Sequence, residues 1–173
     1  MLSIFTRYKH VNDRFTEPAA EFKLPQLYND QTFYKAFVWD LMHAEREVII
    51  ESPFLSRKRT NELVPIFEAL YKRGVQVRIN TRSPFYQNTD EYRIQALTSI
   101  KKLRAAGVKV KWYDDMRHRK IAIVDEKILW EGSLNIMSQS HSIESMTRTQ
   151  SAARCQQVIQ FTGLKRWTQR SVL

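Results

Sequence analysis

The chain has 173 residues, of which 43% are hydrophobic, so it can bury one substantial core but hardly two. Its 28 Lys and Arg residues outnumber the 18 Asp and Glu residues and give a net charge of +10, which favours a phosphate-bearing polymer as partner. No apolar stretch is long enough to span a membrane, and the single Cys155 excludes an intrachain disulfide, so we expect a cytoplasmic protein without a membrane association.

The beginning of the chain differs in character from the rest. Residues 1–29 lack a clear period and contain Pro18 and Pro25, so they are predicted to form an N-terminal extension. Residues 30–173 are predicted to form one domain. The whole chain has only four glycines and no low-complexity stretch, which argues against a flexible linker within that domain.

Strand-like and helix-like segments alternate along this domain. In chain order, the predicted elements are a helix over 31–44, a strand over 48–51, a helix ending at 73, a strand over 75–81, a loop over 84–88, a helix over 90–106, strands over 108–112, 121–124, 128–130 and 145–149, and a helix over 152–161. Asp30 is expected to cap the first helix and Thr60 or Asn61 the second, while Gly74 and Gly107 end the second and third. The alternation predicts an α/β fold in which a mixed β-sheet lies between helices.

A polar motif surrounds the apolar strand 121–124. It consists of six residues at fixed spacing: His118, Lys120, Asp125, Gly132, Ser133 and Asn135. His118 and Lys120 are two positions apart in an extended segment, so they point to the same side. The hairpin carries them toward Ser133 and Asn135, which can donate hydrogen bonds to phosphate oxygens. Gly132 allows a close approach of the backbone to a ligand.

The remaining titratable residues near the motif have competing interpretations. Asp125 occupies the hairpin turn, and we expect a structural role in which its carboxylate accepts from backbone amides of the hairpin. The Glu144 carboxylate, if it accepts from the imidazole Nδ1–H, would fix the tautomer of His118, although an exposed strand glutamate is the competing interpretation. His141 lies near the end of the motif, and a minor contact with the substrate is an open alternative to an ordinary surface histidine.

The motif resembles the HxK-x4-D-x6-GSxN signature of the phospholipase D superfamily, with every fixed position present, and the single copy is similar to the bacterial nuclease-like branch. The resemblance extends over about residues 30–165 and implies the phospholipase D-like fold for the mixed sheet. It also implies a covalent chemistry in which His118 attacks phosphorus, a second histidine protonates the leaving oxygen, and water releases the phosphohistidine. In this family the strand after the motif often carries a functional glutamate, which points to Glu144.

These observations predict a phosphodiesterase that cleaves nucleic acid, with DNA as the expected substrate, and that needs neither metal nor cofactor. Lys120, Ser133, Asn135 and Glu144 are the expected catalytic partners of His118. The basic residues expected to contact nucleic acid are Arg57, Lys58, Arg59, Arg117 and Arg119. Two alternatives stay open: a phospholipase or phosphatidyltransferase with the same chemistry, and a catalytically silent nucleic-acid-binding module.

One motif supplies one histidine, whereas the implied chemistry requires two. Pairing of identical subunits about a two-fold axis is the simplest solution, so we expect a homodimer with a shared active site. A helicase or a recognition subunit is a further expected partner. Cys155 lies in the last predicted helix, and we expect it to be a small core residue and not a nucleophile.

Overall fold

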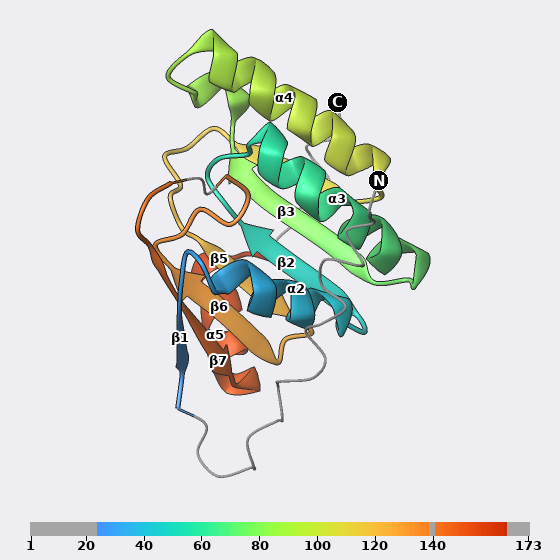
Figure 1. Ribbon diagram of the computed structural model, residues 1–173, viewed down its shortest axis with the longest axis vertical. Coiled ribbons are helices and arrows are strands. Elements are labelled where there is room, and N and C mark those ends of the chain that lie inside the picture. The colour runs from blue at the N-terminus through green and yellow to red at the C-terminus, as the bar shows by residue number, and fades with distance from the viewer. Residues whose placement is uncertain (1–23, 139–140, 166–173) are drawn as a thin grey trace.

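The computed structural model describes residues 24–138 and 141–165, and its centre is one mixed sheet (Figure 1). In the described residues the sheet has seven strands: β1 (Gln26–Asn29), β2 (Glu47–Glu51), β3 (Gln76–Arg82), β4 (Lys109–Tyr113), β5 (Ile121–Val124), β6 (Ile128–Gly132) and β7 (Ser145–Gln150). They lie in the order β1-β7-β6-β5-β2-β3-β4. The pairs β2–β3 and β3–β4 are parallel, and all other pairs are antiparallel.

Helices cover both faces of this sheet, as Figure 1 shows. On the nearer face lie α2 (Phe33–Met42), α3 (Arg57–Lys72) and α4 (Asp90–Ala105), while α5 (Ala152–Thr162) lies behind. The larger core cluster forms on the first face and includes Phe37, Phe67 and Trp130. A smaller cluster forms under α5, where Ile123 and Cys155 are fully buried. The predicted fold class, α/β with a mixed sheet between helices, is therefore confirmed.

The first two helices begin at residues other than the predicted ones. Thr32 precedes α2, and the Asn29 side chain accepts from the Thr32 backbone N–H at 3.0 Å, so Asp30 is not the cap. Helix α3 begins earlier than predicted because the Ser56 side chain accepts from the backbone N–H of Arg59 at 3.1 Å. Thr60 is buried within the helix. The charged first turn of α3 obscured this start in the sequence, since its apolar spacing begins only later.

The end of the predicted extension belongs to the sheet. Residues 26–29 form β1, which pairs with β7 from Gln26 opposite Arg148 to Asn29 opposite Ser145. This edge strand is short and mostly exposed, so it carries little apolar pattern, and its pairing with β7 determines its conformation. The proposed boundary at residue 29 therefore does not separate the sheet from an extension. Residues 1–23 of that extension lie outside the described residues.

The motif gathers at one edge of the sheet because of the strand directions. Since β5 runs antiparallel to β2, the first residue of β5, Ile121, lies opposite the last residue of β2, Glu51. The end of β6 lies beside the start of β7, where Gly132 is opposite Met146. The carboxyl ends of the three parallel strands β2, β3 and β4 reach the same edge. Ligands of open α/β sheets bind at such edges.

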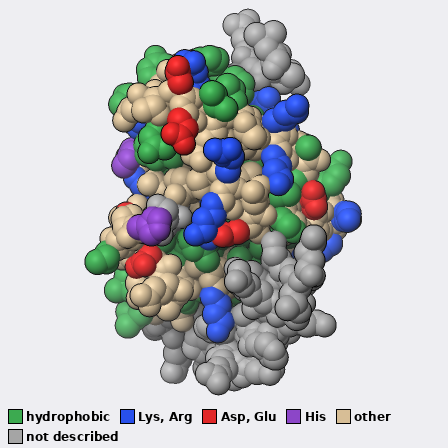
Figure 2. All heavy atoms as spheres, turned by 45° about the horizontal axis from the view of Figure 1, so that its top comes forward, with side chains coloured by type: hydrophobic (Ala, Val, Ile, Leu, Met, Phe, Trp, Pro, Cys, Tyr) green, Lys and Arg blue, Asp and Glu red, His purple; other side chains and the backbone are tan. Residues whose placement is uncertain are grey.

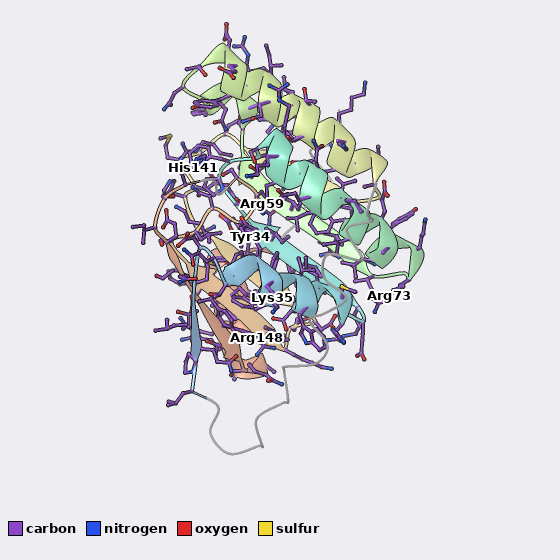
Figure 3. All side chains as sticks on the ribbon, viewed as in Figure 1. Tyr34, Lys35, Arg59, Arg73, His141 and Arg148 are labelled. Carbon is purple, nitrogen blue, oxygen red and sulfur yellow. The ribbon has the colours of Figure 1, made fainter. Side chains whose placement is uncertain are left out.

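A buried ion pair fastens α2 to the antiparallel half of the sheet. Asp40, nearly inaccessible, accepts from Arg148 Nε at 2.8 Å and from Arg148 Nη2 at 2.9 Å. The same carboxylate accepts from Trp130 Nε1 at 2.7 Å. Figure 3 labels Arg148 below α2. Both carboxylate oxygens thus have hydrogen-bond donors, as a buried polar group requires.

Candidate active site

His118 and Lys120 contact each other at the entrance to β5. Lys120 Nζ lies 2.6 Å from His118 Nδ1 and 3.3 Å from His118 Nε2, and it donates to the His118 carbonyl oxygen at 2.7 Å. The prediction that both side chains point to one side of the extended segment is confirmed. An ammonium has only donors, so the ring nitrogen that faces it acts as an acceptor. The contact therefore favours a neutral imidazole.

The electrostatic surroundings favour the same protonation state. Partial desolvation, followed by the positive charges of Lys120 and Arg82, holds the pKa of His118 below its ordinary value. Burial also lowers the pKa of Lys120; the charge of Glu144 opposes this shift and Arg82 adds to it. A neutral imidazole beside a cationic side chain is a competent nucleophile for an anionic phosphate.

Arg82 is a site residue that the sequence reasoning missed. It is almost fully buried at the end of β3, and its Nη2 donates to the Arg117 carbonyl oxygen at 3.1 Å. Its guanidinium carbon lies 5.1 Å from the centre of the Phe54 ring, and the edge of that ring packs against His118 with 5.9 Å between centroids. Arg82 thereby fixes the backbone just before His118. Its only signal in the sequence is a charged residue at the end of an apolar strand.

Glu51 is the second residue missed, and it holds the arginines on either side of His118. It is completely inaccessible, and its carboxylate lies 3.5 Å from Arg117 Nη1 and 3.0 Å from Arg119 Nη2. Desolvation outweighs these cations and raises the pKa of Glu51 above its ordinary value. The carboxylate at the end of β2 thus positions the segment that carries His118. A glutamate directly after Val-Ile-Ile was its only sequence signal.

Arg117 and Arg119, two of the residues predicted to bind nucleic acid, differ in how accessible they are to a ligand. The Arg117 side chain is only 11% exposed; its Nη2 donates to Asp115 at 2.7 Å, and its guanidinium lies 3.3 Å from the centre of the Tyr113 ring. The Arg119 side chain is 41% exposed. Arg117 is therefore largely committed to internal contacts, whereas Arg119 combines its bond to Glu51 with a surface that a ligand can reach.

Gly132 and Ser133 connect the motif to β7. A Cβ atom at Gly132 would meet the Ser145 carbonyl oxygen at 2.2 Å and the Met146 Cα at 2.9 Å, so this position requires glycine. The predicted reason, close approach of the backbone to a ligand, is wrong, because the close approach is to β7. Ser133 Oγ accepts from the Ser145 N–H at 3.2 Å. It also donates to the Ser145 carbonyl oxygen at 3.5 Å, so the hydroxyl supports the strand pairing in both directions.

Asn135 lies in a loop that is anchored in the core. Its neighbours Leu134 and Ile136 are fully buried, and the Ser52 hydroxyl accepts from the Met137 N–H at 3.1 Å. Asn135 Oδ1 is buried and has no hydrogen-bond partner in the described residues. The Lys120 carbonyl oxygen accepts from the Gly132 N–H at 3.3 Å, which joins the two halves of the motif.

Glu144 is half-buried, and its charge opposes the lowering of the Lys120 pKa, but within residues 24–138 and 141–165 it forms no hydrogen bond with His118. The Nδ1 atom that was considered a donor to this carboxylate faces Lys120 instead. His43 Nδ1 lies 2.8 Å from the Trp39 carbonyl oxygen, and His141 is exposed. The described part of the chain therefore brings one histidine, His118, into contact with Lys120.

Asp125 has the structural role that was predicted, but with different partners. Its carboxylate accepts from the backbone N–H groups of Glu45, Arg46 and Glu47 at 2.8, 2.8 and 3.0 Å. These groups precede β2 and do not belong to the hairpin. Burial alone would raise the pKa of Asp125, but the three backbone donors outweigh it and hold the pKa below its ordinary value. Asp125 thus attaches the hairpin to the parallel half of the sheet.

The remaining basic residues lie in the first turn of α3. Arg57 and Lys58 are exposed, whereas Arg59 lies 3.4 Å above the centre of the Tyr34 ring and pairs with Glu62 (Figure 3). The Ser56 N–H donates to the Met137 carbonyl oxygen at 2.9 Å, which places this turn beside the motif loop. Figure 2 shows Lys and Arg side chains spread over the visible face, with single acidic residues among them.

The described residues were also compared with the requirements of a metal site, a reactive cysteine and a membrane-spanning helix. Among residues 24–138 and 141–165, no three His, Cys, Asp or Glu side chains come together as metal ligands would. Cys155 is buried, as predicted, and burial raises the pKa of its thiol to about 11. None of the described helices combines the length and apolar character that a membrane crossing needs.

Comparisons with known proteins agree on the fold and the family. Residues 38–164 match the family model described as cardiolipin synthase, PLD-like domain. Nuc from Salmonella typhimurium, a phospholipase D family member, superposes with a TM-score of 0.65 at 17% identity over 83% of this chain and 93% of its own. NucT from Helicobacter pylori superposes with a TM-score of 0.64 at 16% sequence identity, and the match covers 82% of this chain and 95% of NucT. Phosphatidylserine synthase from Haemophilus influenzae superposes with a TM-score of 0.65 at 11% sequence identity, and the match covers 87% of this chain and 41% of the synthase. No curated protein matches the sequence significantly.

Proposed function

Because the chain belongs to the phospholipase D-like family, we propose that it is a metal-independent phosphodiesterase that cleaves nucleic acid, with DNA as the substrate. The observation that carries this proposal is the contact between Lys120 Nζ and the His118 ring at 2.6 Å. It combines a neutral nucleophile with a cation that neutralises a phosphate oxygen. Lysine and amide donors of this kind can supply the charge stabilisation for which other phosphodiesterases use metals.

The proposed reaction begins when a phosphate oxygen takes the hydrogen bond that Lys120 donates to His118. The lone pair released on the imidazole then attacks phosphorus, and the bond from phosphorus to the leaving oxygen breaks. Lys120 and the Asn135 amide stabilise the charge on the non-bridging oxygens. Water hydrolyses the phosphohistidine, which regenerates the neutral imidazole.

The leaving oxygen requires a proton, and a second His118 supplies it in the proposed homodimer. Two imidazoles on opposite sides of one phosphorus give a nucleophile and an acid in line. Because like charges disfavour double protonation, one of the two remains neutral near neutral pH. Glu144 supports this pair through its effect on Lys120. A helicase or a recognition subunit remains an expected partner.

The net charge of +10 supports a polyanionic substrate, and the exposed Arg57, Lys58 and Arg119 lie on elements that border the site. A reaction at a phospholipid headgroup is the competing function, since phosphatidylserine synthase from Haemophilus influenzae has the same fold. A binding module without catalysis is the third candidate. The lowered pKa of His118 favours a nucleophile over a group that only holds phosphate.

Cleavage assays separate these functions. The protein is incubated in excess EDTA with plasmid, linear duplex and single-stranded DNA, and in parallel with fluorescent phospholipid vesicles. We expect DNA cleavage that falls by about 10⁴-fold or more in His118→Ala. The matched control is His43→Ala, which removes an exposed histidine at the end of α2 and should retain full activity. Cleavage that persists in His118→Ala, or that needs Mg²⁺ or Mn²⁺, would contradict the mechanism.

Analytical ultracentrifugation tests the shared site. We expect a dimer, and activity per subunit that falls when dilution dissociates it. A strictly monomeric protein with full activity at nanomolar concentration would refute the second His118 as the acid. His141→Ala then becomes the decisive variant. Radiolabelled phosphate trapped on the denatured protein, absent from His118→Ala, identifies the covalent intermediate.

A further inference from the structure

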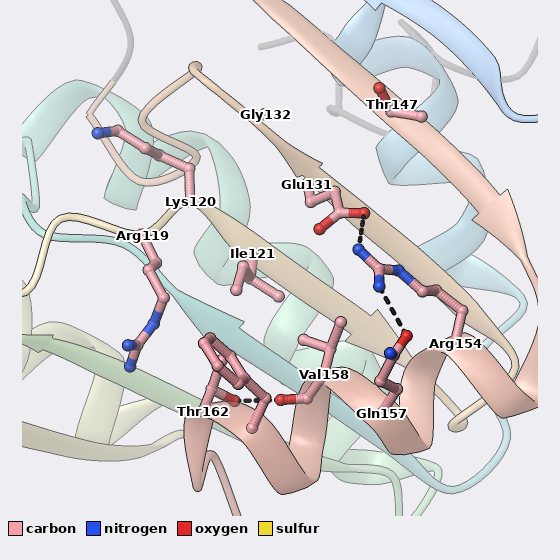
Figure 4. A pocket seen from close by; sticks show the side chains of 11 residues that line it. Arg119, Lys120, Ile121, Glu131, Gly132, Thr147, Arg154, Gln157, Val158 and Thr162 are labelled. Carbon is pink, nitrogen blue, oxygen red and sulfur yellow. Dashed lines mark hydrogen bonds and ion pairs between the residues drawn. The ribbon is translucent and has the colours of Figure 1, made fainter.

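A groove of about 730 Å³ lies between α5 and the strands β5, β6 and β7 (Figure 4). Its volume is typical of sites that bind small molecules or a portion of a polymer. The α5 side contributes Arg154, Gln157, Val158, Phe161 and Thr162, and the sheet contributes Ile121, Glu131 and Thr147. None of these residues belongs to the catalytic machinery described above.

The groove is continuous with the catalytic edge. Lys120 and Gly132, two residues of the motif, line one end of it, together with Arg119. Figure 4 shows Arg119 near one end of α5 and Arg154 near the other, whereas the Lys120 side chain is directed away from α5. Arg119, whose side chain is 41% exposed, can hold a phosphate where the groove begins, so that the substituent next to this phosphate reaches the groove.

The lining suits a planar, partly polar ring system. Ile121 and Val158 form an apolar floor, while Phe161 is 87% exposed and offers an open aromatic face. Polar groups surround them: Arg154 is held by Glu131 at 3.3 Å and by Gln157 at 2.7 Å, which keeps its guanidinium fixed in the groove. Isolated exposed aromatic residues are common, but this one borders a groove that begins beside the motif, at the cationic side chain of Arg119. Aromatic faces beside cationic backbone contacts are the pattern of single-strand binding.

We propose, building on the proposed function, that this groove binds the nucleotide next to the scissile phosphate and that its base stacks on Phe161. A base in this position lies between the sheet and α5, so its hydrogen-bonding edges face protein and cannot pair with a complementary strand. The substrate is therefore single-stranded nucleic acid, and the duplex must be opened before it enters. Stacking of this kind is tolerant of sequence because every base has an aromatic face.

Binding is measured on the His118→Ala protein, which holds the substrate without cleaving it. Fluorescence anisotropy with a labelled oligothymidylate and with a duplex of the same length gives the two affinities. We expect tighter binding of the single strand, and a loss of about 5- to 150-fold when Phe161→Ala is added, the range that corresponds to one stacked base. The matched control is Phe85→Ala, since Phe85 is also exposed, at 67%, but lies outside the groove. It should change the affinity less than twofold.

Photocrosslinking locates the base independently of affinity. An oligonucleotide that carries 5-iodouracil is irradiated on the same protein, and trypsin releases the peptide 155–165, which contains Phe161 between Arg154 and Lys165. We expect the adduct on this peptide. An adduct confined to other peptides, an affinity that Phe161→Ala leaves unchanged, or no binding of the oligonucleotide at all would overturn the proposal.

A second copy of the chain is the competing occupant of this face. If Phe161→Ala weakens the dimer in the ultracentrifuge and leaves the affinity for the oligonucleotide unchanged, the groove belongs to a subunit contact and the proposal is wrong. The proposed function is read separately, from cleavage by the unmodified protein in EDTA. If the unmodified protein cleaves DNA but Phe161→Ala does not change the affinity for the oligonucleotide, the proposal about the groove is wrong and the proposed function stands.

Discussion

The two ends of the β5–β6 hairpin carry residues of one motif, yet their chemistry is opposite. At the turn, the Asp125 carboxylate accepts from three backbone N–H groups, so it is saturated with donors. At the other end, Lys120 and His118 face each other in an environment that disfavours the positive charge of both. The turn stabilises the fold, and the open end keeps reactive groups available.

This difference between the two ends divides the residues of the motif into a structural group and a group that is available to a ligand. Asp125 and Gly132 are fixed by contacts with the backbone of neighbouring segments, which gives them a structural explanation without a substrate. His118 and Lys120 have each other and Arg82 as neighbours, which leaves donors and a lone pair for a ligand. Substitutions at the two ends are therefore expected to affect different quantities: stability at the turn and catalysis at the open end.

Among the substitutions that compare the two ends of the hairpin, Lys120→Met has the largest expected effect, a loss of catalysis. Removing one preorganised donor to a developing oxyanion lowers kcat by about 10²- to 10³-fold. Lys127→Met is the matched control at the turn end, where the lysine is exposed and makes only a distant ion pair with Glu45. Steady-state cleavage rates of both variants test this. Equal rates for the two variants would show that the ends do not differ in function.

Asp125→Asn is expected to lower the free energy of unfolding by about 2–3 kcal/mol, because an amide replaces two acceptor oxygens by one and directs an NH₂ group at backbone donors. Cleavage per folded molecule should be unchanged. Urea unfolding measures the first quantity, and Asp114→Asn, at an exposed carboxylate, is the control. A stable Asp125→Asn protein with greatly reduced activity would reverse the assignment of the two ends.

The acid dependence of stability tests the same residue. The folded pKa of Asp125 lies below its unfolded value of about 3.9, so its contribution is complete above that pH and is lost as the pH falls through the folded pKa. The difference in unfolding free energy between the native protein and Asp125→Asn should therefore narrow as urea titrations move from pH 6 toward pH 3. A difference that stays constant over this range would exclude the carboxylate charge as its source.

At the open end, NMR titration should place the pKa of His118 below its ordinary value of about 6.5. Lys120→Met removes a positive charge that opposes the imidazolium, so the pKa should rise toward the ordinary value. Lys127→Met should leave it unchanged. Since the nucleophile is the neutral form, the acid limb of the cleavage profile should move to higher pH with the measured pKa in any Lys120 variant that retains activity.

The smallest expected effect lies within the turn itself. Glu126 adopts a φ of 56°, a left-handed conformation that asparagine tolerates better than glutamate. Glu126→Asn should therefore change the free energy of unfolding by no more than about 0.5 kcal/mol, because the relief of backbone strain offsets the lost contact with Lys165. A loss of more than 2 kcal/mol would show that this contact, and not the backbone, determines the turn.

Local patterns in the sequence predicted the fold class, the hairpin and the common side of His118 and Lys120, because period and spacing act over a few residues. They did not reveal Glu51 or Arg82, since a single charge at the end of an apolar strand does not disclose its partner. The backbone donors to Asp125 and the close neighbour of Gly132 could not be predicted for the same reason: each contact joins segments that only the strand order brings together. Strand β1 has too weak a pattern to be recognised without β7.

The attachment of Asp125 also has a consequence for how the chain folds. Its carboxylate joins residues up to 80 positions apart, whereas β5 and β6 pair across a short turn. The hairpin therefore forms from local contacts, and its docking against β2 closes a long loop whose entropy must be lost first. We expect the docking to be the slow step. His118 then reaches its charged neighbours only when the two halves of the sheet meet, so the candidate site is completed at the end of folding.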